Sequence, residues 1–235
     1  MKFFKLFSCI ALIGLSLSSS AAEISVAQTQ LQAPAQTNHI IAYFSARQNG
    51  KTTHINTADP QGIYRVLISK SSEGYLVQDF FQANHQAQSS PVLLTDVEDL
   101  DRFQVQSAVG EILLYNRNGQ RFNKQVYDKD HDVIYVAGYS LHGQILLEQE
   151  VNPEDGITHT KLWHSNGTLA FELQSNSDMQ LIDSQAWRRN GKAFNSKTCF
   201  NDRSLDFSSA AVDPCVLQLK SLYQKYEKLW ETQMQ

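Results

Sequence analysis

One short acidic segment, Asp128-Lys-Asp-His-Asp132, has residue types and spacing that could bind a metal ion. Carboxylates at alternate positions resemble the start of a calcium-binding loop, because hard cations prefer oxygen ligands. The sixth position of such a loop is glycine and the twelfth is glutamate. This chain has Val133 and Tyr139 at those positions. The segment is therefore predicted to be a polar hairpin turn, and neither a metal nor another cofactor is expected.

Residues typical of catalytic sites are scattered along the chain. It has seven histidines, at positions 39, 54, 85, 131, 142, 159 and 164, without a His-Glu-x-x-His motif or paired cysteines and histidines at the spacing of a zinc site. No Gly-x-Ser-x-Gly, Ser-x-x-Lys or phosphate-binding glycine motif occurs. The histidines are predicted to lie in turns and strands, and the protein is not expected to be an enzyme. The alternative of a catalytic site assembled from residues far apart in the sequence stays open.

A repeat in the centre of the chain must position any binding residues. Four times an aromatic residue is followed four positions later by glycine, and the four aromatic residues are each 24 positions apart. We call these segments the signature turns: Tyr115–Gly119, Tyr139–Gly143, Trp163–Gly167 and Trp187–Gly191. A constant period over four copies indicates a repeat architecture.

Each repeat has the length of two strands and two turns. The residue before the glycine is asparagine or histidine, and Asn-Gly between apolar runs is the strongest short-range signal for a β-hairpin. Polar segments halfway through each period, near 128–131, 152–156 and 175–178, are predicted return turns. Alternation such as Leu169, Phe171 and Leu173 on one side predicts a two-faced antiparallel sheet. The fold class is therefore mainly β, an array of antiparallel hairpins.

The signature turns, such as Trp163-His-Ser-Asn-Gly-Thr-Leu and Trp187-Arg-Arg-Asn-Gly-Lys, resemble the MORN-repeat variant of bacterial YwqK-family antitoxins. The resemblance covers about 107–198. It implies a hairpin array without enzymatic activity and with a toxin-neutralising role. The chain departs from the family pattern because it lacks the second glycine of many such repeats, for which Gly156 is the nearest equivalent.

The repeated aromatic residues have two interpretations. Tyr115, Tyr139, Trp163 and Trp187 could form a binding strip, because tyrosine and tryptophan are enriched at interface hot spots. They could instead stabilise the sheet through cross-strand packing. Arg188 and Arg189 are adjacent basic residues in the last signature turn. They could bind a partner, or they could simply be solvated turn residues. Residues between aromatic and glycine differ in every copy, so the edge formed by these turns is the predicted partner surface.

The first 22 residues have the pattern of a signal peptide for export. Lys2 and Lys5 precede an apolar run, and small residues end at Ala22, near which cleavage is expected. The stretch is too short for a membrane span. Without it the cysteines are Cys199 and Cys215, and an even pair in an exported protein predicts a disulfide. A periplasmic or secreted location is expected, with a lipoprotein as a weaker alternative.

The remaining regions follow from turn and helix signals. Residues 23–38 are predicted to be a flexible lead-in, and 39–106 an N-terminal hairpin region with an acidic helical turn or loop near 96–101. The repeats are predicted to occupy 107–198, and residues 199–235 are predicted to form a C-terminal helical segment tethered by the disulfide. Asp213-Pro214 predicts a helix start, and apolar residues at three- and four-residue steps extend it to about 233. This helix is expected to cover the terminal edge of the sheet.

Composition narrows the function class. The formal net charge is −4, and no basic domain points to nucleic acid. Three functions remain: a periplasmic protein-binding module of the antitoxin or immunity type, an envelope structural protein that contacts lipid or peptidoglycan, and an unrecognised hydrolase. The first is preferred, with a protein partner such as a toxin.

Overall fold

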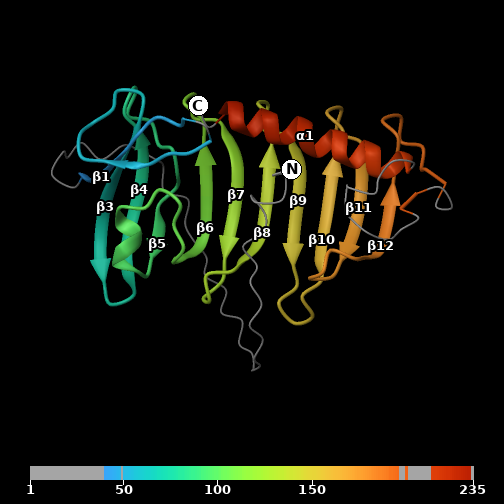
Figure 1. Ribbon diagram of the computed structural model, residues 1–235, viewed down its shortest axis with the longest axis horizontal. Helices are drawn as coiled ribbons and strands as arrows, with labels where there is room; N and C mark the ends of the chain where they lie inside the picture. Colours follow the sequence, from blue (N-terminus) through green and yellow to red (C-terminus); the bar gives the residue numbers. More distant parts are fainter. Residues whose placement is uncertain (1–39, 49, 196–198, 201–212, 234–235) are drawn as a thin grey trace.

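The computed structural model describes residues 40–48, 50–195, 199–200 and 213–233. The predicted signal peptide and lead-in lie outside the described residues. One antiparallel sheet of twelve strands dominates the fold, and the α-helix α1 (Pro214–Gln233) lies across it (Figure 1). The predicted mainly-β fold is thus confirmed. The strands are β1 Ile40–Phe44, β2 His54–Ile55, β3 Ile63–Ser71, β4 Gly74–Phe81, β5 Val92–Leu94, β6 Ala108–Tyr115, β7 Arg121–Tyr127, β8 Val133–Tyr139, β9 Ile145–Val151, β10 Thr158–Trp163, β11 Leu169–Ser175 and β12 Leu181–Ala186.

The strands follow one another across the sheet almost in chain order. From β3 to β12 every strand pairs with the next, and β1 lies between β2 and β3. The N-terminal hairpins join the repeats through the short strand β5, where Leu93 pairs with Val109 and Leu94 with Ala108. The N-terminal hairpins therefore continue the same sheet as the repeats.

The return turns lie where the polarity of the sequence predicts them. Asp128 N–H donates to the carbonyl of Asp132 and His131 N–H to that of Asp128. The turn Asn176–Gln180 has the same pattern, and the turn at Asn152 is one residue longer. Opposite ends of the strands thus carry signature turns and return turns, respectively.

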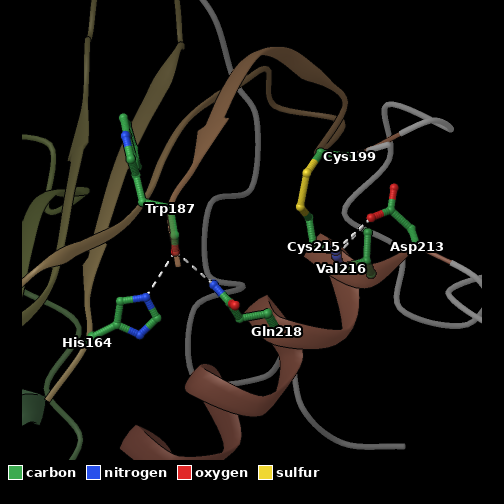
Figure 2. The surroundings of a disulfide bond; sticks show 7 residues. All are labelled: His164, Trp187, Cys199, Asp213, Cys215, Val216 and Gln218. Carbon is green, nitrogen blue, oxygen red and sulfur yellow. Dashed lines mark hydrogen bonds between the residues drawn. A yellow bond between two sulfur atoms is a disulfide. The ribbon is translucent and has the colours of Figure 1, made fainter. Parts of the chain in front are cut away.

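The helix α1 begins at Pro214, where the Asp213-Pro214 sequence predicts a helix start. The Asp213 carboxylate accepts hydrogen bonds from the backbone N–H groups of Cys215 and Val216, at 2.8 and 3.2 Å, and satisfies donors that the first helical turn leaves open (Figure 2). Pro214 occupies the first helical position, which needs no N–H donor.

The prediction that α1 covers the terminal edge of the sheet is wrong, because the helix crosses one face of the repeats (Figure 1). Its 20 residues span about 30 Å, the width of about six strands. A helix of that length buries its apolar stripe over several strands, whereas one edge strand would leave most of it exposed. The cluster so formed contains Leu147, Leu162 and Phe171 of the sheet with Leu219 and Tyr226 of α1.

A disulfide between Cys199 and Cys215 joins the first turn of α1 to the chain after the last repeat (Figure 2). The pairing is the one that the cysteine count predicts. Cys215 is fully buried and packs in the same cluster as Phe200. The disulfide therefore fixes the end of the helix that lies over β11 and β12.

A different segment covers the N-terminal half of the same face. It contains the 3-10 helix η2 (Val97–Leu100), at the predicted acidic turn. The buried Arg65 of β3 forms two hydrogen bonds with the Asp79 carboxylate, at 2.7 and 2.8 Å, and donates to the carbonyls of Asp99 and Arg102. A buried charge is tolerated only when it is paired and hydrogen-bonded. Arg65 therefore holds this cover against the sheet.

Candidate functional site

The signature turns share one backbone structure. In the second copy, Ser140 N–H donates to the carbonyl of Gln144 and Gly143 N–H to that of Ser140, and the other three copies have equivalent bonds. The four glycines have φ between 73° and 84°, a left-handed conformation that glycine adopts without steric cost. This is a type I turn followed by a bulge, a common three-residue hairpin loop. Each turn therefore presents its variable residues in the same orientation.

Side chains link neighbouring turns along this edge of the sheet. Asn84 donates to the carbonyl of Arg117 at 2.7 Å, and Gln120 donates to that of Leu141 at 2.9 Å. Further along, the Asn166 amide donates to the carbonyl of Arg189 at 2.9 Å. A row of loops tied in this way loses little conformational freedom when a partner binds. We call this row of four turns the signature edge.

The four aromatic side chains lie on the side of the sheet opposite α1. Strand register places Gly138, Leu147 and Leu162 in one row that faces the helix, and each aromatic residue is one position further along its strand. Tyr139 is buried, with the guanidinium carbon of Arg121 4.1 Å from the centre of its ring. Tyr115, Trp163 and Trp187 are half-buried. The rings of Tyr115, Trp163 and Trp187 therefore pack within the sheet and keep part of their surface open, whereas the Tyr139 ring is covered.

The backbone carbonyls of three signature aromatic residues accept hydrogen bonds from α1. Tyr226 donates its hydroxyl to the carbonyl of Trp163, and Trp230 donates its indole N–H to that of Tyr139 at 3.3 Å. The Trp187 carbonyl lies 3.2 Å from the Gln218 amide nitrogen and 3.0 Å from His164 Nε2 (Figure 2). These contacts were not predicted from the sequence. The hydroxyl of Tyr226 and the indole N–H of Trp230, both on the apolar side of the helix, could have indicated that α1 donates hydrogen bonds to the sheet. The helix thus holds the backbone at the start of three signature turns from the opposite face of the sheet.

Gly138 explains how the helix can approach so closely. A Cβ atom at this position would lie 1.9 Å from Cζ2 of Trp230. The contact brings the Trp230 indole directly against the backbone of β8. A residue with a side chain at 138 would push α1 away from the sheet.

The basic pair Arg188 and Arg189 lies exposed in the last signature turn. The Arg188 guanidinium carbon is 4.4 Å from the centre of the Phe194 ring, and Arg189 lies 3.4 Å from the hydroxyl of Ser165 in the preceding turn. A cation over an aromatic face gains about 0.5–1 kcal/mol at an exposed site. Both side chains are therefore held by neighbours while their charges face solvent.

The open face of the sheet carries charged side chains that bind one another. Lys124 lies 2.6 Å from the Glu111 carboxylate, and Lys161 lies 3.4 Å from that of Glu172. Tyr135 donates its hydroxyl to Glu148, and burial together with this carboxylate raises the pKa of Tyr135 well above its ordinary value. This arrangement gives each group a structural partner within the sheet.

The acidic segment at 128–132 uses its first carboxylate to close its own turn. Asp128 Oδ1 accepts hydrogen bonds from the N–H groups of Asp130 and Asp132, each at 2.9 Å. Lys129 lies 2.9 Å from the Asp130 carboxylate. Among the described residues, no group of three or more histidine, cysteine, aspartate or glutamate side chains is placed to hold a metal ion. The segment is the polar turn that the repeat period predicts.

A shallow hollow of about 590 Å³ lies between the first two signature turns. Its lining includes Tyr115, Arg121, Leu141 and His142. Small-molecule sites enclose most of their ligand, whereas this hollow is broadly open to solvent. A hollow as open as this one does not enclose a small molecule.

Comparison with known proteins does not place the chain in a family. No model of a protein family matches the chain, and no curated protein matches it. Among the described residues, no helix combines the length and the apolar character that a membrane span requires.

Proposed function

We propose that this chain is an exported protein-binding module of the antitoxin or immunity type, which acts by binding a protein partner rather than by catalysis. The signature edge is the proposed contact surface, with Tyr115, Trp163 and Trp187 as anchors and Arg188 and Arg189 beside the last of them. The fourth expected anchor, Tyr139, is buried beneath the exposed Arg121, so Arg121 takes its place in the proposed surface. The family resemblance of the signature turns supports the same role.

One observation carries this proposal: four turns of identical backbone structure present different side chains in one row. Hydrogen bonds join the first turn to the second and the third to the fourth, and α1 bonds to the last three. Rigid loops with variable residues are the usual way in which a repeat scaffold recognises a partner. Half-buried tryptophan rings beside these loops have the character of interface hot spots.

Export is supported by the disulfide. Structural disulfides form and persist in oxidising compartments and are rare in the bacterial cytosol. The Cys199–Cys215 bond therefore agrees with the expected signal peptide and with a periplasmic or secreted location.

The test is recovery of a partner from envelope extract with the mature chain as bait. Trp163→Ala, and separately the double variant Arg188→Ala/Arg189→Ala, should reduce recovery at least tenfold, as expected for interface anchors. Each variant must first show the melting temperature of the parent, since Trp163 also packs within the sheet.

The matched control is Ile68→Ala, which removes an exposed apolar side chain from the N-terminal hairpins. This variant should recover the partner as well as the parent does. If Ile68→Ala abolishes recovery while the signature-edge variants do not, recognition lies in the N-terminal region and the proposal is wrong.

A further inference from the structure

The two ends of the repeat strands carry opposite charge. The segments 115–121, 139–145, 163–169 and 187–193 contain no aspartate or glutamate, and their basic residues are Arg117, Arg121, Arg188, Arg189 and Lys192. The segments 127–133, 151–157 and 175–181 at the other end contain a single basic residue, Lys129, and six acidic ones: Asp128, Asp130, Asp132, Glu154, Asp155 and Asp178. The repeat region is therefore polarised along its strands.

The two charged ends act as separate surfaces. A repeat strand of seven residues spans about 23 Å, whereas charges in water at physiological salt are screened over about 8 Å. A molecule that approaches the signature edge therefore experiences mainly the charges at that end of the strands, and those of the signature turns are all basic. The acidic net charge of the whole chain does not describe this end.

Several of these cations remain available to a partner. Arg121, Arg188, Arg189 and Lys192 are exposed. In the part of the chain that the structure describes, none of the four has a carboxylate within 4.0 Å. Arg121 is held over Tyr139 and Arg188 over Phe194, so their charges have fixed positions.

We infer that the signature edge recognises an acidic surface of a protein. This inference rests on the proposed function and adds the chemistry of the partner. The first and last signature turns are three repeats apart, about 29 Å, which matches the width of a standard protein–protein interface. An acidic patch of that size would meet Arg121 at one end and the Arg188, Arg189 and Lys192 cluster at the other.

An anionic membrane fits this edge less well. Binding to anionic lipid headgroups is typical of four to eight clustered basic residues. Here the cations are divided between two ends of the row, and the two middle turns carry the neutral side chains Ser140, Leu141, Ser165 and Asn166 together with His142 and His164. Hydroxyl, amide and imidazole groups between separated charges suit the irregular surface of a protein.

The experiment measures binding of the folded, disulfide-bonded mature chain to three probes: poly-L-glutamate, poly-L-lysine and phosphatidylglycerol vesicles. Poly-L-glutamate should bind at low salt and dissociate at high salt, and poly-L-lysine should leave the amide resonances of the signature turns unchanged. The double variant Arg188→Glu/Arg189→Glu should weaken poly-L-glutamate binding about tenfold or more, since local charge controls association of this kind.

The matched control is Lys70→Glu/Lys129→Glu, which changes the net charge equally but alters the opposite end of the strands. It should leave the affinity for poly-L-glutamate close to that of the parent. Equal weakening by the two double variants would overturn the inference, as would vesicle binding without poly-L-glutamate binding. If poly-L-glutamate binds as expected but no partner is recovered from envelope extract, the proposed function is contradicted and the charge preference of the signature edge is not.

Discussion

Met179 and His131 occupy, in two return turns, the left-handed backbone position that glycine occupies in the signature turns. Their φ angles are 60° and 70°. A non-glycine residue in this conformation costs roughly 1–2 kcal/mol because Cβ approaches the neighbouring carbonyl oxygen. The side chain of His131 is placed to offset part of this cost, because its ring nitrogens lie 3.2 Å from the Ala108 carbonyl and 3.3 Å from the Thr95 hydroxyl. Met179 is exposed, and its side chain has no such contact with the residues that the structure describes.

We therefore expect Met179→Gly to raise the free energy of unfolding by about 1 kcal/mol. Urea denaturation measures the change. Met179→Ala keeps the Cβ atom and should give no comparable gain, and His131→Gly should gain less because it loses two side-chain contacts. A destabilised Met179→Gly variant would show that the strain assigned to this turn is absent.

At the scale of elements, the close contact between α1 and β8 depends on Gly138. Gly138→Ala should destabilise the protein by about 1–3 kcal/mol, the usual effect of overpacking, because the new methyl group collides with Trp230. Trp230→Ala removes the colliding ring and has its own cost. The double variant should therefore be less destabilised than the sum of the two single variants in urea denaturation. Strict additivity would mean that the helix does not seat Trp230 over Gly138.

Docking of α1 should also be sensitive to alkaline pH. Burial raises the pKa of Tyr226 to about 12, from an ordinary value near 10. Between these values the unfolded chain has lost the tyrosine proton while the folded chain keeps it. The free energy of unfolding should therefore fall as pH rises from about 10 to about 12, by at most about 1.4 kcal/mol per pH unit from this group.

Denaturation of the parent and of Tyr226→Phe at a series of alkaline pH values checks this expectation. The phenylalanine variant loses the hydrogen bond to the Trp163 carbonyl, so it should be less stable at neutral pH. Its stability should decline less steeply above pH 10. An unchanged slope would assign the alkaline loss to other tyrosines, such as the half-buried Tyr223, whose pKa is also raised by desolvation.

At the scale of the whole molecule, one face of the continuous sheet is covered twice, by the segment around η2 and by α1, and the other carries mutually paired charges. The repeats and the bounds of α1 could be predicted from sequence, because Asn-Gly turns, a constant period and the Asp213-Pro214 cap are local signals. The position of α1 on the sheet could not be predicted, because an apolar stripe identifies the buried side of a helix but not the strands beneath it.

The same distinction applies to the candidate site. The signature edge follows from the repeat period, because equivalent residues of successive hairpins must share one end of the sheet. The buried Arg65–Asp79 pair and the Arg121–Tyr139 contact follow from strand register and from segments that fold back over the sheet. Neither has a signal in the local sequence.

The most direct test of the central claim is hydrogen exchange of the backbone amides in the complex with the partner recovered from envelope extract. Partner binding should slow exchange in the four signature turns at 116–120, 140–144, 164–168 and 188–192. The return turns at 128–132, 152–157 and 176–180 should exchange as they do in the free protein. Protection confined to the return turns or to the N-terminal hairpins would contradict the assignment of the signature edge as the partner surface.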